Sequence, residues 1–275
     1  MRPLFQFWLL WLLVVPLAGF PQSVSGAEDA AARYTSEEAT LTLVAEEPDA
    51  NGDFRVALVI DLAAGWKTYW TDPGDAGIPP SIDLSGSRNA IAQPPSFPAP
   101  HRFGDAFGSS NGYSQPMAVA LRMREELASE KTEIRAKVFI GVCRDICIPV
   151  SADLVAIPGK DRDGMVASAF AALPGAGDPA HRIVGAALSS DLATLTVSVI
   201  TQNADEADVF VAGPEGWGFG TPAPAIGDGD RWTFALPVQS KPRHAQAASA
   251  PPFDIVLTSQ AGAVEARAVI ATPMP

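Results

Sequence analysis

The sequence predicts an all-β protein, with two immunoglobulin-like β-sandwich modules in tandem and a short connecting helix. Three observations predict this fold class. Apolar and polar residues alternate with a period of two in several short segments, which is typical of strands with one buried face. The 25 prolines and 23 glycines lie mostly between these segments, where they favour turns. Only one segment has a helical composition. Many short strands separated by turns are typical of a sandwich.

The clearest predicted strand covers residues 54–62. Arg55 and Asp61 fall on one face, and the opposite face carries the apolar residues Phe54, Val56, Leu58, Ile60 and Leu62. Three segments in the second half of the chain alternate in the same way, namely residues 194–199, 232–236 and 253–257. Strands are therefore expected in both halves of the chain.

A helix is predicted over residues 165–173, because this segment is rich in alanine and is followed by Pro174-Gly175. Asp163 is the candidate N-cap. The next residues, 174–180, have the composition of a linker. The predicted division is therefore a first module at 28–173, the linker at 174–180 and a second module at 181–275, the last near the size of one immunoglobulin-like sandwich.

Residues 1–27 have the features of a cleaved secretory signal peptide. Arg2 is followed by a nearly continuous apolar run over residues 4–20, and small residues precede the expected cleavage after Ala27. An uncleaved membrane anchor is the alternative, but Pro16 and the small residues favour cleavage. No later segment has the roughly 18 apolar residues that a spanning helix needs. We therefore expect an exported protein without an intrinsic membrane span after cleavage.

The charge of the chain excludes some classes of partner. Cleavage would leave 248 residues and would change the net charge from −12 to −13, because Arg2 is lost. Such an acidic surface argues against nucleic acid and against anionic membranes as partners.

Cys143 and Cys147 are the only two cysteines, and three residues separate them. In an exported protein such a pair is expected to form a disulfide. As a structural bond, it would close about five residues and contribute only about 2 kcal/mol, compared with about 4.7 kcal/mol for a loop of about 100 residues. A protein with a large β core hardly needs so small a contribution. A short loop is more typical of a catalytic or regulatory pair.

Two other chemical roles of the pair are open. Two thiolates suit a soft ion such as Cu(I), whereas a closed zinc site needs four ligands, and no histidine lies at ligand spacing from the cysteines. Alternatively, the pair is a redox-active dithiol, in which one thiolate attacks a disulfide and the second thiol resolves the intermediate. That role requires the chain to fold back between the two cysteines. Arg144 would lower a thiolate pKa and Asp145 would raise one.

Further motifs precede the cysteines in a fixed order. Residues 65–80 read GWKTYWTDPGDAGIPP, residues 98–103 read PAPHRF, a Gly-Tyr pair occupies 112–113, and residues 141–149 read GVCRDICIP. This series resembles the N-terminal periplasmic domain of the transmembrane thiol-disulfide reductases of the DsbD type and, more closely, of the copper-tolerance ScsB type. The matching motifs cover roughly a third of the chain, from about residue 65 to about residue 155.

The resemblance implies an immunoglobulin-like domain in which Cys143 and Cys147 are the redox pair. It also implies a cap loop at residues 101–110 that shields the reduced cysteines with an aromatic side chain. Phe103 and Phe107 are the candidates, with Phe107 preferred for its neighbour Asp105. The alternative is that both phenylalanines only pack in the core.

The same resemblance implies that the aromatic residues of the 65–80 motif, Trp66, Tyr69 and Trp70, belong to the scaffold. It also implies a periplasmic location. The chain departs from the family in two ways: classical DsbD domains have a wider gap between their cysteines, and this chain has neither a membrane-spanning bundle nor a thioredoxin-like module.

We therefore expect a periplasmic thiol-disulfide oxidoreductase that relays reducing equivalents through the cysteine pair. Its expected partners are a separate membrane-embedded thiol reductant and periplasmic thioredoxin-like or disulfide proteins, and no cofactor is expected. One alternative is a Cu(I)-binding copper-tolerance module that uses the thiolates of Cys143 and Cys147. The other is a structural β-sandwich with a stabilising disulfide.

Overall fold

The computed structural model of the protein describes residues 31–105, 108–161 and 163–274. Within these residues the chain is nearly all β, as predicted, and its α-helical content is the single helix α1 (Met165–Ala171). The predicted signal peptide, residues 1–27, lies outside the described residues. In the part of the chain that is described, no helix is both long enough and apolar enough to cross a membrane.

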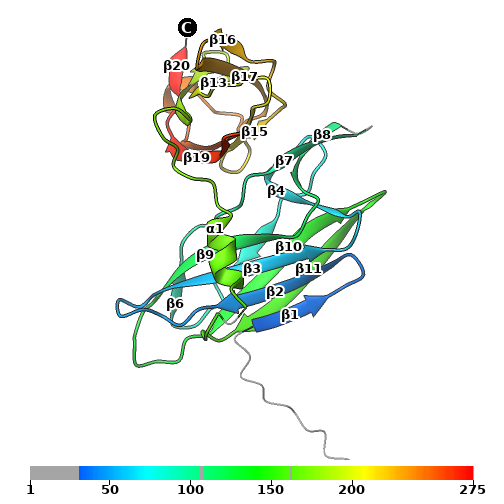
Figure 1. The fold of residues 1–275 in the computed structure, drawn as a ribbon, viewed down its shortest axis with the longest axis vertical. Helices are drawn as coiled ribbons and strands as arrows, with labels where there is room; N and C mark the ends of the chain where they lie inside the picture. The colour runs from blue at the N-terminus through cyan, green and yellow to red at the C-terminus, as the bar shows by residue number, and fades with distance from the viewer. Residues whose placement is uncertain (1–30, 106–107, 162, 275) are drawn as a thin grey trace, which may run out of the picture.

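The first module is a sandwich of two sheets (Figure 1). One sheet contains, in spatial order, β1 (Ala31–Thr35), β2 (Ala39–Ala45), β3 (Asp53–Leu62), β9 (Met117–Glu125) and β6 (Ala90–Ala92). The other contains β11 (Cys147–Ala156), β10 (Ile134–Cys143), β4 (Lys67–Gly74), β8 (Gly108–Tyr113) and β7 (His101–Asp105), with β5 (Ser81–Asp83) also paired to β10. The second sheet therefore carries both cysteines, at the ends of neighbouring strands.

The core lies between these sheets, and β3 confirms the predicted alternation. Its inward residues Phe54, Val56, Leu58 and Ile60 are all buried. The outward Ala57 is also buried, because α1 packs across this face with Val166 and Ala169. The short helix thus covers the outer face of the sheet that does not contain the cysteines.

Helix α1 ends two residues before the predicted end, at Ala171. Its first amides are also bound by a different residue from the one predicted. The backbone N–H groups of Val166 and Ala167 donate to the Asp161 carboxylate, 3.1 Å away in each case, and Asp163 has no such role. This carboxylate lies five or six residues before the amides that it binds, a longer separation in the sequence than a linear capping pattern covers.

The second module also has two sheets. One contains β15 (Gly218–Phe219), β17 (Arg231–Ser240), β13 (Thr194–Ile200), β12 (Arg182–Ser189) and β20 (Thr272–Met274), with β16 (Ile226–Asp228) also paired to β17. The other contains β14 (Asp208–Ala212), β18 (Phe253–Ser259) and β19 (Gly262–Val269). The predicted strands at 194–199, 232–236 and 253–257 lie within β13, β17 and β18. A separate hydrophobic cluster fills the space between these two sheets.

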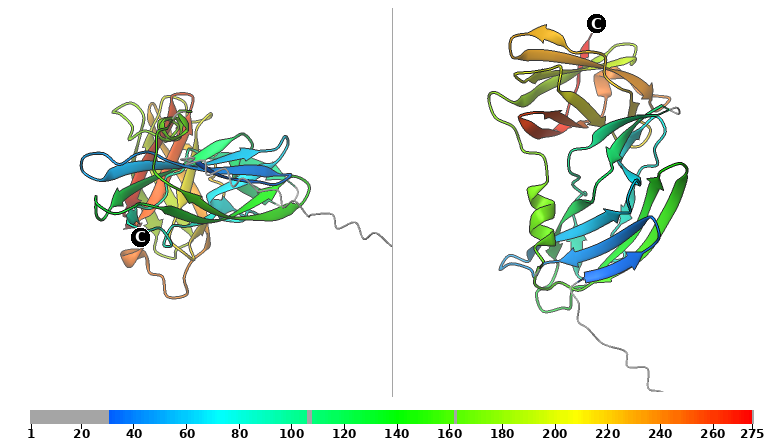
Figure 2. Two further views of the ribbon diagram at one scale, coloured as in Figure 1. Left: turned by 90° about the horizontal axis from the view of Figure 1, so that it is seen from below. Right: turned by 45° about the vertical axis from the view of Figure 1, so that its right-hand side comes forward.

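The second module stands over the end of the first module that contains β4, β7 and β8 (Figure 2). Phe210 of β14 and Val256 of β18 join the hydrophobic cluster of the first module. The segment that follows α1 is held on the second module, because Gly175 exchanges backbone hydrogen bonds with the β19 residues Ala263 and Glu265. The exact division at residues 174–180 remains our proposal.

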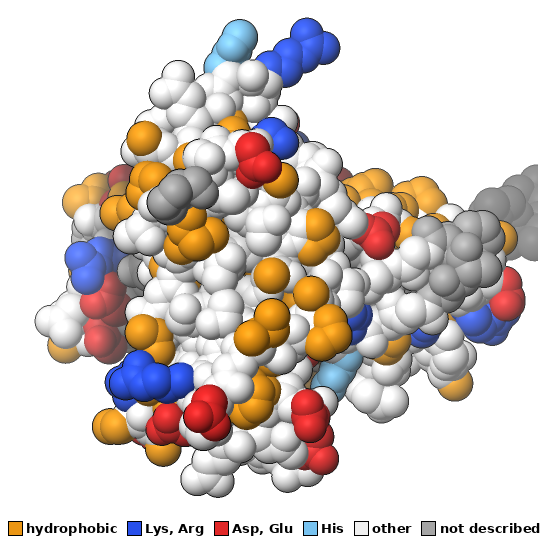
Figure 3. Space-filling model, turned by 90° about the horizontal axis from the view of Figure 1, so that it is seen from above, with side chains coloured by type: hydrophobic (Ala, Val, Ile, Leu, Met, Phe, Trp, Pro, Cys, Tyr) orange, Lys and Arg blue, Asp and Glu red, His pale blue; other side chains and the backbone are white. Residues whose placement is uncertain are grey.

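The end of the molecule formed by the second module is not uniformly polar. Figure 3 shows apolar side chains in small groups over this face, with charged side chains mostly around them. Val184, Ile226 and Ile270 are the large apolar residues of this module whose side chains are exposed. Single exposed apolar residues are ordinary on protein surfaces.

Candidate thiol-disulfide site

The two cysteines face each other across a β-hairpin. Strands β10 and β11 pair antiparallel from Ile134–Ala156 to Cys143–Cys147, so the cysteines are the last pair before the turn at residues 144–146. Their Cα atoms are 4.1 Å apart and their sulfur atoms form a disulfide. A closely opposed cross-strand pair places both side chains on the same face of the sheet. The hairpin therefore provides the reversal of the chain that a dithiol pair needs.

The two sulfur-bearing residues differ in exposure. Cys143 is only 8% exposed, because β10 lies inside the sheet between β11 and β4. Cys147 is exposed, because it begins the edge strand β11. Among the described residues, Cys147 is therefore the more open of the two to a thiolate from another protein, whereas Cys143 is covered by neighbouring residues.

The hydroxyl of Tyr69 contacts the buried sulfur. It lies 2.8 Å from Cys143 Sγ and 3.4 Å from Cys147 Sγ. Disulfide sulfurs carry no hydrogen, so the phenol donates to them. The Tyr69 ring is itself buried, at 8% exposure. Gly77 leaves space for the ring, since a Cβ at this position would lie 2.7 Å from Tyr69 Cδ1.

Further side chains on this face come from β4 and β7. Lys67 is the cross-strand partner of Cys143, so their side chains lie on the same face of the sheet, and Tyr69 follows two residues later along β4. Lys67 Nζ lies 4.6 Å from the centre of the Phe103 ring, in a cation–π contact. Beneath them, the hydroxyl of Thr68 donates to the Gly141 carbonyl at 2.9 Å and joins β4 to β10.

The structure describes only some of the predicted cap residues. Phe103 is half-buried on β7, and its ring contacts the Lys67 side chain on the disulfide face of the sheet. The backbone of Asp105 pairs with Gly108 at the end of the β7–β8 hairpin. Phe107 and the side chain of Asp105 lie outside the described residues. The preference for Phe107 as the cap therefore stays a prediction.

The turn between the cysteines is exposed. Arg144 Nε lies 3.3 Å from the Asp145 carboxylate, and the Arg144 guanidinium lies 5.0 Å from the centre of the Trp66 ring. Ile146 is 68% exposed and directly precedes Cys147. This turn thus presents an apolar side chain beside the accessible sulfur.

A buried carboxyl lies farther along β4, between the two modules. Asp72 is 9% exposed, and its Oδ2 has no hydrogen-bond partner among the residues that the structure describes. Burial raises the pKa of Asp72 from 3.8 to about 6, although the backbone N–H groups of Gly74 and Phe219 and the nearby Arg102 guanidinium act to lower it. Asp72 is therefore the carboxyl that titrates closest to neutral pH among the groups with a resolved shift.

Sequence reasoning did not assign functional roles to Tyr69 and Asp72. It placed Tyr69 in the scaffold with Trp66 and Trp70. The one sequence signal that pointed to Tyr69 was its place in the 65–80 motif. A contact with a cysteine 74 positions away follows only from the pairing of β4 with β10.

The Cu(I) hypothesis depends on the two cysteines alone. Among the residues that the structure describes, no group of three or more His, Cys, Asp or Glu side chains is gathered as metal ligands. When reduced, Cys143 and Cys147 would offer two soft sulfur ligands side by side.

Comparison with known proteins supports the first module most directly. Residues 33–158 match the family model described as Thiol:disulfide interchange protein DsbD, N-terminal. Among solved structures, the N-terminal periplasmic domain of ScsB from Proteus mirabilis has a similar fold, with a TM-score of 0.66 and 20% sequence identity. That similarity covers 87% of this chain and 97% of the ScsB chain, so it extends over both modules. No curated protein matches the chain in sequence. The resemblance that the sequence motifs indicated is confirmed.

Proposed function

Because residues 33–158 match the DsbD N-terminal family, we propose that this protein is an exported thiol-disulfide exchange protein that relays reducing equivalents through Cys143 and Cys147. One observation carries the proposal. The two cysteines form the last pair before the turn of a hairpin, where Cys147 is exposed and Cys143 is buried beside the Tyr69 hydroxyl. This asymmetry assigns a different task to each cysteine.

Reduction of the pair begins at the exposed sulfur. A thiolate of the reductant attacks Cys147 Sγ, a new S–S bond forms between the two proteins, and the Cys143–Cys147 bond breaks. The electron pair of the broken bond remains on Cys143 as a thiolate. A second thiol of the reductant then loses its proton and attacks the mixed disulfide. Cys147 is released as a thiolate, and the reductant leaves with its own disulfide.

Electrons leave by the reverse chemistry. The Cys147 thiolate attacks the disulfide of an acceptor protein and releases one acceptor sulfur as a thiolate. Cys143 then attacks Cys147 Sγ in the mixed disulfide, which restores the intramolecular bond and releases the second acceptor sulfur. Two electrons pass from the reductant to the acceptor in each cycle. The reductant and acceptor that fit this cycle are a membrane-embedded thiol protein and periplasmic thioredoxin-like or disulfide proteins.

Tyr69 stabilises the leaving group of the first step. Negative charge develops on Cys143 Sγ as the disulfide breaks, and the Tyr69 hydroxyl already lies within hydrogen-bond distance of that atom. A donor in place before charge develops stabilises the transition state without reorganisation. Thiol-disulfide exchange is also faster when the leaving thiol has a low pKa.

Single-cysteine variants test the proposal. Cys143→Ser leaves the exposed Cys147 without its resolving partner, so this variant should accumulate a mixed disulfide with an oxidised thioredoxin-like protein. Cys147→Ser keeps only the buried thiol and should accumulate much less. The mixed disulfides are measured on non-reducing gels and identified by mass spectrometry. If neither variant forms a mixed disulfide while the wild-type disulfide resists mild thiols, the exchange function is refuted. Equal trapping by both variants would refute the assignment of Cys147 as the attacking residue.

A further inference from the structure

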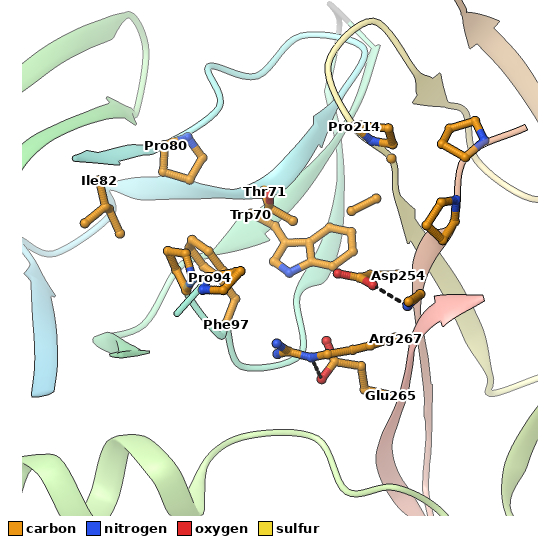
Figure 4. Close-up of a pocket in the computed structure, with 16 residues that line it drawn as sticks. Trp70, Thr71, Pro80, Ile82, Pro94, Phe97, Pro214, Asp254, Glu265 and Arg267 are labelled. Carbon is orange, nitrogen blue, oxygen red and sulfur yellow. Dashed lines mark hydrogen bonds and ion pairs between the residues drawn. The ribbon is translucent and has the colours of Figure 1, made fainter. Parts of the chain in front are cut away.

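The sheet that carries the cysteines has the disulfide on one face and a contact with the second module on the other. Along β4, neighbouring side chains point to opposite faces. Tyr69 contacts Cys143, and the next residue, Trp70, contacts the second module, where its indole meets the Phe210 ring edge-to-face at 6.1 Å. Figure 4 shows Trp70 extending from β4 between the two modules, where it lines a cleft of about 650 Å³. Contacts made by the second module therefore act on the strand that carries Tyr69.

Neighbouring side chains also point to opposite faces on β7, the edge strand farthest from β11. Phe103 lies against Lys67 on the disulfide face. The preceding residue, Arg102, points to the second module and forms two hydrogen bonds with the Asp208 carboxylate, at 2.9 and 3.0 Å. The Arg102 side chain is only 15% exposed, so this two-pronged contact is better shielded from water than a surface ion pair.

Arg102 makes further contacts that fix its position. It donates to the backbone carbonyl of Val209 at 3.0 Å and to the Asn111 side chain at 2.9 Å. Its guanidinium lies 4.6 Å from the centre of the Phe210 ring. Arginine is suited to such a site because its planar group donates in several fixed directions and stacks on aromatic rings. The position of β7 is thus held by β14 of the second module.

A second contact between the modules holds β8. We call this contact, Asp75–Gln239, and the Arg102–Asp208 pair the two ties. The Asp75 carboxylate accepts a hydrogen bond from the Ser109 backbone N–H at 3.2 Å, and the Asp75 N–H donates to the Ser109 carbonyl at 2.8 Å. The other carboxylate oxygen of Asp75 accepts a hydrogen bond from the Gln239 side chain on β17. The β7–β8 hairpin is therefore attached to the second module through both of its strands.

We propose that the second module is a positioning element for the exchange site. Asp208 and Gln239 act through Arg102 and Asp75, and these ties hold Phe103 against Lys67, the cross-strand neighbour of Cys143, on the disulfide face of the sheet. The proposal rests on the proposed function, because it gives the second module a role in controlling access to the resolving cysteine. None of the four tying residues touches the sulfur atoms, so their effect is indirect.

The test measures access to Cys143 in variants that also carry Cys147→Ser, where Cys143 is the only thiol. The rate of alkylation by iodoacetamide is followed by mass spectrometry across a range of pH, which separates the thiolate pKa from the limiting rate of the thiolate. Asp208→Asn removes the charged contact with Arg102 and keeps a side chain of the same shape. We expect it to raise the limiting alkylation rate by about three- to tenfold, a usual range for indirect coupling.

Asp53→Asn is the matched control. It removes a similar two-pronged pair, with Arg124, at the edge of the first module away from the cysteines. We expect this change to alter the rate by less than about 1.5-fold, because exposed ion pairs contribute little. Gln239→Ala, at an exposed position on the second tie, should also raise the rate. The proposal is overturned if the rates of Asp208→Asn and Gln239→Ala both match that of the unaltered Cys147→Ser protein, or if Asp53→Asn raises the rate equally. Alkylation needs no exchange partner, so this outcome is independent of the trapping experiment.

Discussion

The hydroxyl of Tyr69 lies 2.8 Å from Cys143 Sγ, the buried sulfur of the disulfide, although 74 positions separate the two residues. The pairing of β4 with β10 brings them together, and Gly77 leaves the space that the tyrosine ring occupies. This contact connects the strand that carries the GWKTYW motif to the chemistry of the cysteine pair.

Removing the Tyr69 hydroxyl should slow disulfide exchange. Tyr69→Phe is expected to lower the rate of reduction by dithiothreitol by about tenfold, because a hydrogen bond to a charged group contributes about 1.5–3 kcal/mol. The pKa of Cys143 in the reduced protein should rise for the same reason. Stopped-flow reduction and alkylation at varied pH measure the two effects.

Tyr113→Phe is the matched control for this variant. Tyr113 is buried in the same sheet, and its hydroxyl donates to the Pro98 carbonyl at 2.8 Å. Its loss should affect stability but leave the rate of reduction within about twofold of wild type, since the hydroxyl does not contact sulfur. An equal decrease in both variants would remove Tyr69 from the proposed mechanism.

A larger residue at position 77 should displace the Tyr69 ring. A Cβ there would lie 2.7 Å from Tyr69 Cδ1 and 2.3 Å from Pro73 Cβ. We expect Gly77→Ala to slow reduction and to destabilise the protein by about 1–3 kcal/mol. Gly104→Ala, on β7, is the control, because a Cβ at that position meets nothing within 4 Å.

Combining Gly77→Ala with Tyr69→Phe tests whether the two changes act through one contact. If the glycine acts by placing the hydroxyl, the double variant should be reduced no more slowly than Tyr69→Phe alone. Additive decreases in rate would show that Gly77 acts on the site by another route.

The disulfide should contribute little to stability. It closes a loop of about five residues that the β10–β11 pairing already holds, so reduction should lower the free energy of unfolding by about 2 kcal/mol or less. Urea unfolding of the oxidised and reduced protein measures the difference. We also expect a reduction potential above about −300 mV, as for pairs that take part in exchange. A loss of more than about 4 kcal/mol on reduction would favour the structural alternative.

Asp72 should make stability depend on pH between about 4 and about 6. Its pKa is raised in the folded protein, so the folded state holds a proton that the unfolded state releases at lower pH. The free energy of unfolding should therefore fall as pH rises through this window and then level off. The shift corresponds to at most about 3 kcal/mol at about 1.4 kcal/mol for each pH unit.

Asp72→Asn tests this assignment because asparagine does not ionise. Urea unfolding between pH 4.5 and 8 should show a weaker decrease with pH in this variant and a higher stability than wild type above pH 7. Asp53→Asn should keep the wild-type pH dependence across this range, because the Arg124 hydrogen bond lowers the pKa of Asp53 and moves its effect to more acidic pH. The same slope in wild type and Asp72→Asn would contradict the assignment.

Much of the fold could be predicted from local pattern. The period of two at Phe54–Leu62 and in the second half of the chain is a property of each strand alone, because one face is buried and the other is not. The cysteine pair and its short loop were equally visible, since both depend on positions close together in the sequence. The contact of Asp161 with the start of α1 was not predicted, because the two groups lie five residues apart in the sequence, beyond the local spacing of a cap.

The sequence by itself determined the β class, one strand in the first module and three in the second, and the identity of the cysteine pair. Only the tertiary structure decided which sulfur is buried, because burial depends on the order of the strands in the sheet, with β10 inside and β11 at the edge. It also decided that Tyr69 faces the disulfide while Trp70 faces the second module. The motif shows both only as neighbouring aromatic residues, and their separate partners come from segments distant in the sequence. Long-range pairing selects those partners, and no local pattern of residues encodes it.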